Sequence, residues 1–412
     1  MKILILGGSN SQLNAILRAK SKGHTVIVAD YYEDAPGKAF SDYSENISTF
    51  DIEGNIQLAH KYNIDGVMTI GTDQPVYTVT EVARALKLPA LIDVDTAKAV
   101  TNKKLMKKIF SENEIPTVKY KLIREDFRDQ ELEDINFPVV IKPVDSQGQR
   151  GVYKLDIIED IREVFQDVLS YSREKEILVE EFYPSDEITV SGWVDDGEVY
   201  MISIVDRISH NHYPHIGVCI RHHFPSKYMQ NYFDEIVTIT KKIVACFHIE
   251  HGPIYFQMLL GDKGIKVNEI ACRIGGAYED QYLNKVTGID MLDMLIDATL
   301  GKEVDCRRLK DFDLYSMQHK ISVEMFFARP CTIHSLTDIN EIKKLPGVIQ
   351  AQHNFKLGDC IKEMTNATQR AGYMIIEGKN EAILRENIQR AYGRLGIYNA
   401  HGENMIFRFD LK

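Results

Sequence analysis

The chain has 412 residues, which is more than one hydrophobic core usually serves, so it predicts two or three domains. Its 44% hydrophobic and 26% charged residues are typical of a soluble globular protein. The formal net charge of −11 argues against a nucleic-acid partner, because binding a phosphate backbone requires a basic face.

The six cysteines are scattered without a Cys-x-x-Cys pair, so the sequence predicts neither a disulfide framework nor a zinc knuckle. This usage fits a reducing cytoplasm. The N-terminus opens on a strand without an apolar signal core, and no window approaches the roughly 18 apolar residues of a membrane span. We therefore expect a cytoplasmic protein with no membrane partner.

The first 95 residues alternate strands with helices. Strands are predicted over residues 2–6, 25–30 and 66–70, and helices over residues 11–22 and from about 74 to 86. Strands separated by helices indicate a parallel, doubly wound sheet.

A glycine turn after the first strand and Asp30 at the end of the second suggest a nicotinamide-binding fold as an alternative. That fold requires Gly-x-Gly-x-x-Gly, whereas this turn has Ser9 and Gln12 at the second and third glycine positions. Without those glycines the backbone cannot approach a pyrophosphate closely. We expect the turn to contact a substrate or to serve strand–helix packing.

Residues 102–110 predict a basic amphipathic helix, and its charge run is typical of a solvated face. A short β-branched strand from Val139 then ends at Lys142, and a loop with two glycines leads to a second strand at Val152. A strand-borne lysine is a fixed cation, and glycines let backbone N–H groups approach an anion, so this stretch suits a polyphosphate. It is not a Walker loop. A hairpin with an exposed lysine is the structural alternative.

A strand is predicted over residues 177–182. Two further strands, over residues 187–193 and 199–205, are predicted to pair across a turn at Asp195-Asp196-Gly197. Residues 208–224 hold five of the 13 histidines, and the pattern favours a polar active-site loop. A zinc site is less favoured because no acidic or cysteine ligand recurs among them, and an inert surface loop is also open. Residues 228–247 predict a helix.

The second stretch with evident chemistry is residues 252–276, where a Gly-Asp-Lys-Gly turn predicts a β-hairpin. Gln257 and Glu269 then lie roughly opposite one another. Side chains alternate in a strand, so Glu269, Ala271 and Arg273 should share one face, with Asn268 on the other. An amide oxygen, a carboxylate and an arginine suit magnesium and a phosphate. An exposed hairpin with a Glu–Arg pair is the alternative.

These pieces together, in this order, resemble the ATP-grasp superfamily across essentially the whole chain. The resemblance implies an α/β domain over residues 1–95, a two-lobed α+β ATP-grasp domain over 96–310, and a small C-terminal α+β domain over 311–412. That tail is similar to the one in the biotin carboxylase and carbamoyl-phosphate synthetase branch. The run from Arg273 to Gly276 most resembles the L-amino acid ligase group.

The resemblance implies roles for individual residues. Lys103 and Lys142 match phosphate-binding cations, and the loop Ser146, Gln147, Gly148 to Gly151 matches the loop that folds over the triphosphate. Glu180, Glu181 and Phe182 match the hinge strand that binds adenine, and Glu187 matches the acid that holds the ribose. Gln257 and Glu269 match ligands of Mg²⁺ or Mn²⁺, and Arg273 and Lys142 match the catalytic cations. Gly275 and Gly276 are the implied substrate residues, and His223 of the histidine-rich segment is a further candidate.

The implied chemistry is an ATP-dependent carboxylate–amine (or thiol) ligation of small molecules through an acyl phosphate, releasing ADP and phosphate. One departure bears on competence, because Ala271 stands where the family commonly has an asparagine metal ligand. The alternatives are a purine-pathway phosphoribosylamine–glycine-type ligase, a biotin-carboxylase-like enzyme, a non-catalytic ATP sensor and, from another class, a nicotinamide oxidoreductase. Relatives are commonly homodimers.

Overall fold

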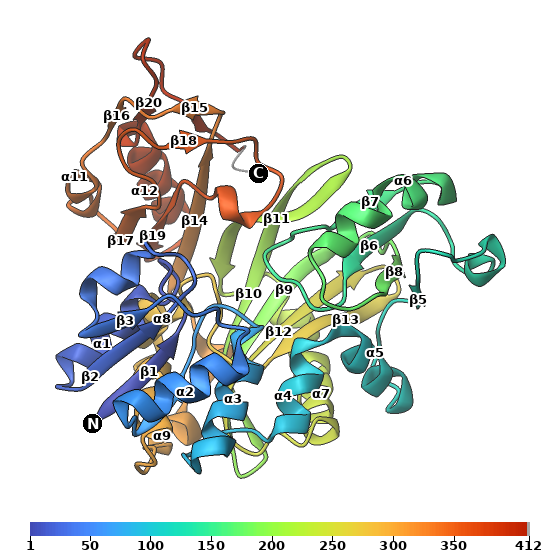
Figure 1. Cartoon of the computed structure of the whole chain (residues 1–412). Helices are drawn as coiled ribbons and strands as arrows, with labels where there is room; N and C mark the ends of the chain where they lie inside the picture. Colours follow the sequence, from blue (N-terminus) through green and yellow to red (C-terminus); the bar gives the residue numbers. More distant parts are fainter. Residues whose placement is uncertain (410–412) are drawn as a thin grey trace. The chain divides into compact units, whose positions relative to one another are not determined.

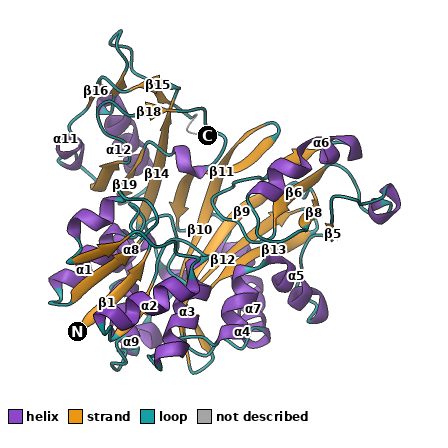
Figure 2. Ribbon diagram, viewed as in Figure 1, coloured by secondary structure: helices purple, strands orange, loops and turns teal. Residues whose placement is uncertain are grey.

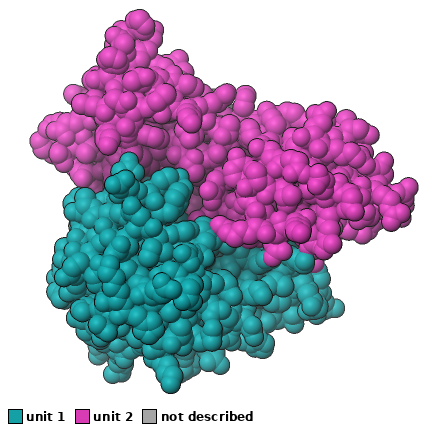
Figure 3. Space-filling model, in the orientation of Figure 1, with its two compact units in different colours: residues 1–117, 189–203, 230–314 teal, residues 118–188, 204–229, 315–412 magenta. Residues whose placement is uncertain are grey.

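The computed structural model describes residues 1–409, which form two compact units (Figure 3). Unit 1 contains residues 1–117, 189–203 and 230–314, and unit 2 contains residues 118–188, 204–229 and 315–412. The chain crosses between the units five times, and two of these crossings lie within strands, β9 (Asp186–Asp195) and β10 (Glu198–His212). Helices and strands both contribute to each unit (Figure 2), which confirms the predicted mixed α/β class.

Unit 1 begins with a parallel sheet in the order β3-β2-β1-β4 (Figure 1). The predicted doubly wound topology is confirmed. Apolar strand residues such as Leu4 and Ile27 pack with Leu58 and Val82 of the helices in one core, which is what drives this layer together. Its elements are β1 (Lys2–Leu6), α1 (Leu13–Ser21), β2 (Thr25–Ala29), β3 (Tyr43–Glu45), α2 (Ile52–Tyr62), β4 (Gly66–Met68), α3 (Pro75–Leu86) and α4 (Val94–Thr101).

The rest of unit 1 is built around an antiparallel hairpin, β12 (Gly252–Gly261) with β13 (Gly264–Ala271). Its packed face carries buried Phe256, Met258 and Val267. The helices of this part are α5 (Lys103–Glu112), α7 (Met229–Cys246), α8 (Glu279–Thr287), α9 (Met291–Thr299) and α10 (Arg307–Asp311).

Unit 2 holds an antiparallel strand group in the order β7-β6-β8-β5, with α6 packed on it (Figure 1). Ile141, Val179 and Phe165 lie in its core. Because β6 and β8 run antiparallel, Val140 lies opposite Glu180 and Lys142 opposite Leu178. The elements are β5 (Tyr120–Ile123), β6 (Val139–Pro143), β7 (Tyr153–Leu155), α6 (Ile158–Ser170) and β8 (Ile177–Glu181).

The C-terminal part of unit 2 is an α+β layer in which β14 pairs with β11 (His215–Phe224) and β19. A separate core joins Phe326 and Met374 of the strands to Ile388 of α12. The elements are β14 (Lys320–Ala328), β15 (Cys331–Thr332), β16 (Ser335–Leu336), α11 (Ile339–Lys343), β17 (Val348–His353), β18 (Cys360–Ile361), β19 (Gly372–Gly378), α12 (Glu381–Arg394), β20 (Ile397–Tyr398) and β21 (Ile406–Phe407).

The histidine-rich segment differs from its prediction. Residues 208–224 are not a loop but the paired ends of β10 and β11, joined at Tyr213-Pro214. The alternation of apolar and polar residues from His215 to Phe224 is a strand pattern, and β11 is held on its other side by β14. Among residues 1–409, no helix is long and apolar enough to cross a membrane.

The glycine turn after β1 is filled by the Gln12 side chain. Its amide Nε2 donates to the Ile70 carbonyl at 2.7 Å, and its Oε1 accepts from the Ser9 hydroxyl at 2.6 Å. Asp30 accepts from the backbone N–H of Gly8 at 2.8 Å. The glycine turn and the Asp30 carboxylate, which a dinucleotide-binding fold would use for its cofactor, therefore serve here to join β1, β2 and the segment after β4.

We expect Gln12→Ala to lower the free energy of unfolding by about 1–3 kcal/mol, because the substitution leaves buried partners of the amide without a hydrogen bond. Urea denaturation monitored by circular dichroism measures this. Gln57→Ala, which removes an exposed glutamine of α2, is the control and should change stability by less than about 0.5 kcal/mol. Equal losses for the two variants would contradict the structural role of Gln12.

Candidate active site

Hairpin β12–β13 presents the two side chains that the sequence pairs as metal ligands. Gln257 lies directly opposite Glu269, which confirms the predicted register. Both side chains are partly exposed, whereas Phe256 and Ile270 beside them are buried, so the hairpin has one packed face and one polar face. A carboxylate and an amide oxygen are the donors that a hard cation such as Mg²⁺ or Mn²⁺ takes, so this donor set fits the metal.

The prediction that Asn268 lies on the opposite face is wrong. The register changes between Gln257 and Met258, which pair with Glu269 and Val267 and leave Asn268 as an extra residue in β13. Such a β-bulge interrupts the strict alternation of side chains. The Asn268 amide consequently lies 3.5 Å from the Gln257 amide oxygen.

Lys103 is brought to the same hairpin by the start of α5. Asn102 caps this helix, because its side-chain oxygen accepts the backbone N–H of Lys104 at 3.0 Å. The Lys103 ammonium lies 3.4 Å from Glu269 Oε1. Lys103 and Lys107 are buried, since this face of α5 packs against β13 and not against water, contrary to the solvated face expected.

Arg273 follows β13 and is held in a fixed orientation. Its Nε donates to Asp73 Oδ1 at 2.7 Å, and the guanidinium lies 4.4 Å from the centre of the Tyr255 ring. Burial alone would lower the pKa of Arg273, but Asp73, Tyr255 and Glu279 together more than offset this effect, and the pKa is raised. No local sequence pattern links Asp73 to Arg273, because 200 residues separate the two.

The glycines after Arg273 are required by close contacts. A Cβ on Gly276 would lie 2.6 Å from the Gly71 carbonyl oxygen, and one on Gly275 would lie 2.4 Å from the Glu279 carboxylate. The backbone N–H of Gly71 also donates to the Ile274 carbonyl at 3.0 Å. The two glycines thus leave room for the Gly71 carbonyl and the Glu279 carboxylate to pack closely against the segment that follows Arg273.

Glu279 is a buried carboxyl group that sequence reasoning missed. Its Oε2 accepts the backbone N–H of Ala277 at 3.0 Å. Burial raises the pKa of Glu279 to about 7, with the nearby Arg273 acting in the opposite direction. No motif in the sequence marks it, because the helix start that carries it reads as an ordinary acidic first turn.

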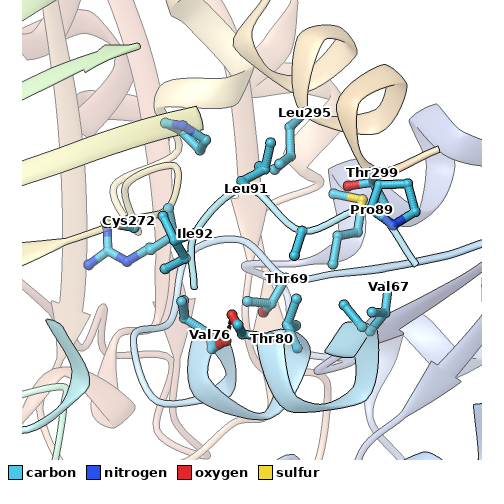
Figure 4. Close-up of a pocket in the computed structure, with 16 residues that line it drawn as sticks. Val67, Thr69, Val76, Thr80, Pro89, Leu91, Ile92, Cys272, Leu295 and Thr299 are labelled. Atoms are coloured by element: carbon cyan, nitrogen blue, oxygen red, sulfur yellow. Dashed lines mark hydrogen bonds between the residues drawn. The ribbon is translucent and has the colours of Figure 1, made fainter. Parts of the chain in front are cut away.

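The cavity in Figure 4 is not large enough to be a substrate site. It measures about 50 Å³ and is lined mostly by apolar side chains, among them Val67, Ile92 and Leu295. Ligand pockets are usually several times larger, on the order of 300 Å³ or more. Cys272 also lines it, and burial raises the pKa of that thiol to about 12, so it stays protonated and unreactive.

In unit 2, Lys142 ends β6 and is almost fully buried. Its Nζ lies 2.6 Å from Glu180 Oε2 on the neighbouring strand β8. Both side chains are at most 6% exposed, so the ion pair is formed largely away from water. The exposed lysine of the hairpin alternative is therefore ruled out, and the charge of Lys142 is held in place by β-sheet geometry.

The loop after Lys142 is anchored at its base and carries glycines at its bends. Asp145 accepts hydrogen bonds from the Ser172 hydroxyl and the Arg173 backbone N–H. Gly148 and Gly151 have φ of +71° and +69°, the left-handed region that favours glycine. The Gly148 carbonyl accepts from the Ala367 N–H at 3.1 Å. Ser146 is buried, and Gln147 between these points is half-buried.

Several polar groups of the hinge segment, residues 180–182, form hydrogen bonds within the protein. Glu181 accepts two hydrogen bonds from Asn136, at 2.7 and 3.0 Å. The backbone N–H groups of Glu181 and Phe182 donate to the carbonyls of Lys119 and Pro138, each at 2.9 Å. An adenine edge bound along this strand would therefore use its carbonyl groups or the residues that follow.

Glu187 and His223 line one cavity of about 520 Å³ within unit 2. Glu187 pairs with the buried Arg207, which also donates to the Gly217 carbonyl at 2.9 Å. His223 Nε2 lies 3.3 Å from Glu381. Burial lowers the pKa of His223, although Glu381 acts against this, so the imidazole is neutral at pH 7.

Arg221 lies in the wall of the same cavity and was not singled out from the sequence. Its Nε and Nη2 atoms donate to the two carboxylate oxygens of Glu324, at 2.5 and 3.0 Å. Such a two-point contact fixes the plane of the guanidinium.

The predicted site residues are divided between the two units. Unit 1 carries Lys103, Gln257, Glu269, Arg273, Gly275 and Gly276, and unit 2 carries Lys142, the loop 146–151, residues 180–182, Glu187 and His223.

Two family models match the chain. Residues 135–280 match the ATP-grasp domain, and residues 324–400 match the L-amino acid ligase C-terminal domain 2. The first match spans Lys142, the hinge segment, Gln257, Glu269 and Arg273. The second falls in the α+β layer of unit 2.

The individual relatives have low sequence identity to this chain, but their alignments cover most of its length. Dapdiamide A synthase of Enterobacter agglomerans is 21% identical over 353 residues, which cover 82% of this chain and 81% of that protein. An L-arginine-specific L-amino acid ligase of Bacillus subtilis is 23% identical and covers 70% of each chain. The crystal structure of an L-amino acid ligase from Bacillus licheniformis has the same fold, with a TM-score of 0.80, 18% identity and coverage of 97% of this chain and 98% of the other.

Glu279 makes stability depend on pH. Because burial raises its pKa from 4.5 to about 7, the folded chain keeps this proton while the unfolded chain releases it. The contribution is fully present below about pH 4.5 and is lost as the pH rises to about 7. We expect Glu279→Gln to reduce the loss of stability across that window by up to about 3 kcal/mol.

Urea denaturation at several pH values from 4.5 to 8 measures this difference. Glu33→Gln, an exposed carboxylate, is the control and should follow the wild type. A Glu279→Gln profile parallel to that of the wild type would show that the carboxyl group titrates alike in the folded and unfolded chain.

Proposed function

We propose that this ATP-grasp protein, whose residues 324–400 match the L-amino acid ligase C-terminal domain 2, joins the carboxyl group of one amino acid to the amino group of another. It is an ADP-forming carbon–nitrogen ligase of the ATP-dependent carboxylate–amine type. The amino-acid nature of the two substrates is the finer part of this proposal. It is supported by the C-terminal domain match and by the long, colinear similarity to an L-arginine-specific L-amino acid ligase.

The observation that carries the proposal is the polar face of the hairpin. Gln257 and Glu269 stand opposite one another, and the Lys103 ammonium lies 3.4 Å from the Glu269 carboxylate. Oxygen donors beside a cation are suited to a divalent metal carrying nucleotide phosphates. When bound, Mg²⁺ neutralises phosphate charge, and the side chains of this face would hold it.

We assign the remaining nucleotide contacts to unit 2. Lys142 supplies a buried cation for the phosphates, its charge balanced by Glu180 in the absence of nucleotide. The loop 145–151 supplies backbone N–H groups, which its glycines leave uncovered by side chains. Glu187 is assigned to the ribose hydroxyls, and the adenine edge to the carbonyl side of residues 180–182 or to the residues that follow.

The reaction would proceed in two displacements. An oxygen of the substrate carboxylate attacks the γ-phosphorus of ATP and releases ADP, giving an acyl phosphate. The amine of the second amino acid then attacks the acyl carbon, phosphate leaves, and the nitrogen loses a proton. Arg273, held rigid by Asp73, would stabilise the charge on the transferred phosphoryl group without reorganising during the step.

The two substrate groups are assigned to the features that match their charges. The backbone N–H groups of Gly275 and Gly276 are assigned to a substrate carboxylate, since neither residue has a side chain to cover them and the cationic Arg273 lies two residues before Gly275. His223 is assigned to the amine, because a neutral imidazole can accept the proton that the nucleophile releases. A non-catalytic ATP sensor would retain the nucleotide contacts without this turnover.

We expect the purified protein to convert ATP to ADP and phosphate only when Mg²⁺ and suitable amino acids are present together. Coupled release of phosphate with pooled amino acids, followed by mass spectrometry of the products, measures both turnover and the dipeptide. ATP binding without turnover in every pool would favour a sensor. If the protein binds NAD selectively and shows no affinity for ATP, the ligase assignment fails.

We expect Lys142→Ala to weaken ATP binding by about 10- to 100-fold, since a charge-assisted contact is lost. It should also cost about 3–5 kcal/mol of stability, because Glu180 is left buried without its cation. Isothermal titration with ATP and chemical denaturation measure the two effects.

The double variant Lys142→Ala/Glu180→Gln removes both charges and should recover most of the stability while ATP binding stays weak. Lys175→Ala, an exposed lysine of unit 2, is the control and should alter neither quantity. Recovery of ATP affinity in the double variant would indicate that Lys142 serves folding alone.

A further inference from the structure

The β-bulge in β13 brings a third oxygen-bearing side chain to the polar face of the hairpin. Val267 pairs with Met258 and Glu269 pairs with Gln257, so Asn268 is the extra residue that forms the bulge. Asn268 and Glu269 are both partly exposed, whereas Val267 and Ile270 on either side are buried. Two consecutive side chains therefore leave the packed face, which regular strand alternation would not permit.

The Asn268 amide is within reach of the group that Gln257 would use to bind a metal. Asn268 Nδ2 lies 3.5 Å from Gln257 Oε1. A half-turn of either amide exchanges its nitrogen and oxygen, so the same side-chain position can present the Asn268 oxygen to a cation. Glu269, which follows in the chain, carries the carboxylate of the same face and contacts Lys103 at 3.4 Å.

The bulge is anchored from outside the hairpin. The Val267 N–H donates to the Pro116 carbonyl at 2.6 Å, and the Val267 carbonyl accepts from the Thr117 hydroxyl at 2.9 Å. The Thr117 oxygen in turn accepts from the fully buried Lys107 ammonium at 2.6 Å. Both backbone groups of Val267 are thus bound to the segment after α5, which holds Asn268 in its position.

Position 271 has no side-chain oxygen that could bind a metal, whereas Asn268 has one. Strand alternation from Glu269 places residue 271 on the same face, but Ala271 has no ligand atom and lies buried opposite Tyr255. A hard cation on this face would otherwise have two side-chain oxygen ligands, from Gln257 and Glu269. Six or more oxygens usually surround such a cation, so each additional protein oxygen strengthens the site.

We propose that Asn268 is the third side-chain metal ligand of this site and replaces the amide missing at position 271. The bulge moves the amide from two residues after Glu269 to the residue before it. This rests on the proposed nucleotide and metal site of the hairpin. It explains how the chain binds a divalent cation although Ala271 departs from the superfamily pattern.

Binding of Mn²⁺ in the presence of ADP tests the proposal without depending on turnover. The free Mn²⁺ signal in electron paramagnetic resonance gives the dissociation constant for wild type and variants. We expect Asn268→Ala to weaken Mn²⁺ binding by about 10-fold or more, as loss of a group at a metal site does. Asn268→Asp keeps an oxygen at the position and should bind Mn²⁺ at least as tightly as the wild type.

The double variant Asn268→Ala/Ala271→Asn returns the amide to the other position and should recover Mn²⁺ affinity to within about 3-fold of the wild type. Lys266→Ala, two residues along the same strand, is the matched control and should bind Mn²⁺ normally. Circular dichroism establishes that each variant is folded, and Asn268→Asp separates loss of the ligand from loss of the bulge.

Wild-type affinity for Mn²⁺ in folded Asn268→Ala would overturn the role of Asn268 and leave the proposed function standing. If the wild type itself binds neither Mn²⁺ nor ADP, the proposed function fails as well. The two failures are therefore distinguishable in one set of titrations.

Discussion

The antiparallel pairing of β12 with β13 is the constraint on which the chemistry of unit 1 depends. It sets an amide and a carboxylate opposite one another, although Gln257 and Glu269 are 12 residues apart in the chain. The packed face of the hairpin fixes which side chains reach the polar face, since a slip of one residue would bury Glu269 and expose Ile270. Lys103 reaches this face only because α5 packs on the same hairpin.

Arg273 shows how a distant segment completes such a site. A guanidinium at the end of a strand is free to adopt several orientations, and Asp73 removes this freedom through a short contact from the segment after β4. The glycines that follow let the Gly71 loop and the residues 274–276 approach each other within the distance that a Cβ would occupy. The arginine and the backbone groups beside it are therefore held in fixed positions, and in the reaction that we propose this is the condition for electrostatic stabilisation of a transition state.

In unit 2, too, a charged side chain is held in place by an oppositely charged partner, and here the pairing of two strands brings the charges together. Lys142 and Glu180 lie on adjacent strands, diagonally across one face, so their charges meet in a setting with little water. A buried pair of this kind contributes little net stability against an apolar replacement, yet it is costly to break. In the function that we propose, Lys142 is the cation for the nucleotide phosphates and Glu180 is its counter-charge.

The sequence by itself determined the elements whose periodicity is strong and the motifs whose chemistry is local. The parallel strands of the first domain, the 252–276 hairpin and the strand bearing Lys142 could all be predicted, because alternation of apolar residues and a Gly-Asp-Lys-Gly turn act over a few residues. The resemblance to the ATP-grasp superfamily was readable from the order of these motifs.

Tertiary structure decided what depends on contacts between distant segments. The histidine-rich stretch became a pair of strands because β14, about 100 residues later in the chain, hydrogen-bonds to β11. Asn268 joined the polar face because Pro116 and Thr117 bind both backbone groups of Val267 and hold the bulge. Asp73 orients Arg273 through an ion pair across 200 residues of chain, and burial near Arg273 raises the pKa of Glu279. Burial and long-range hydrogen bonding carry no local pattern, so only the folded chain reveals them.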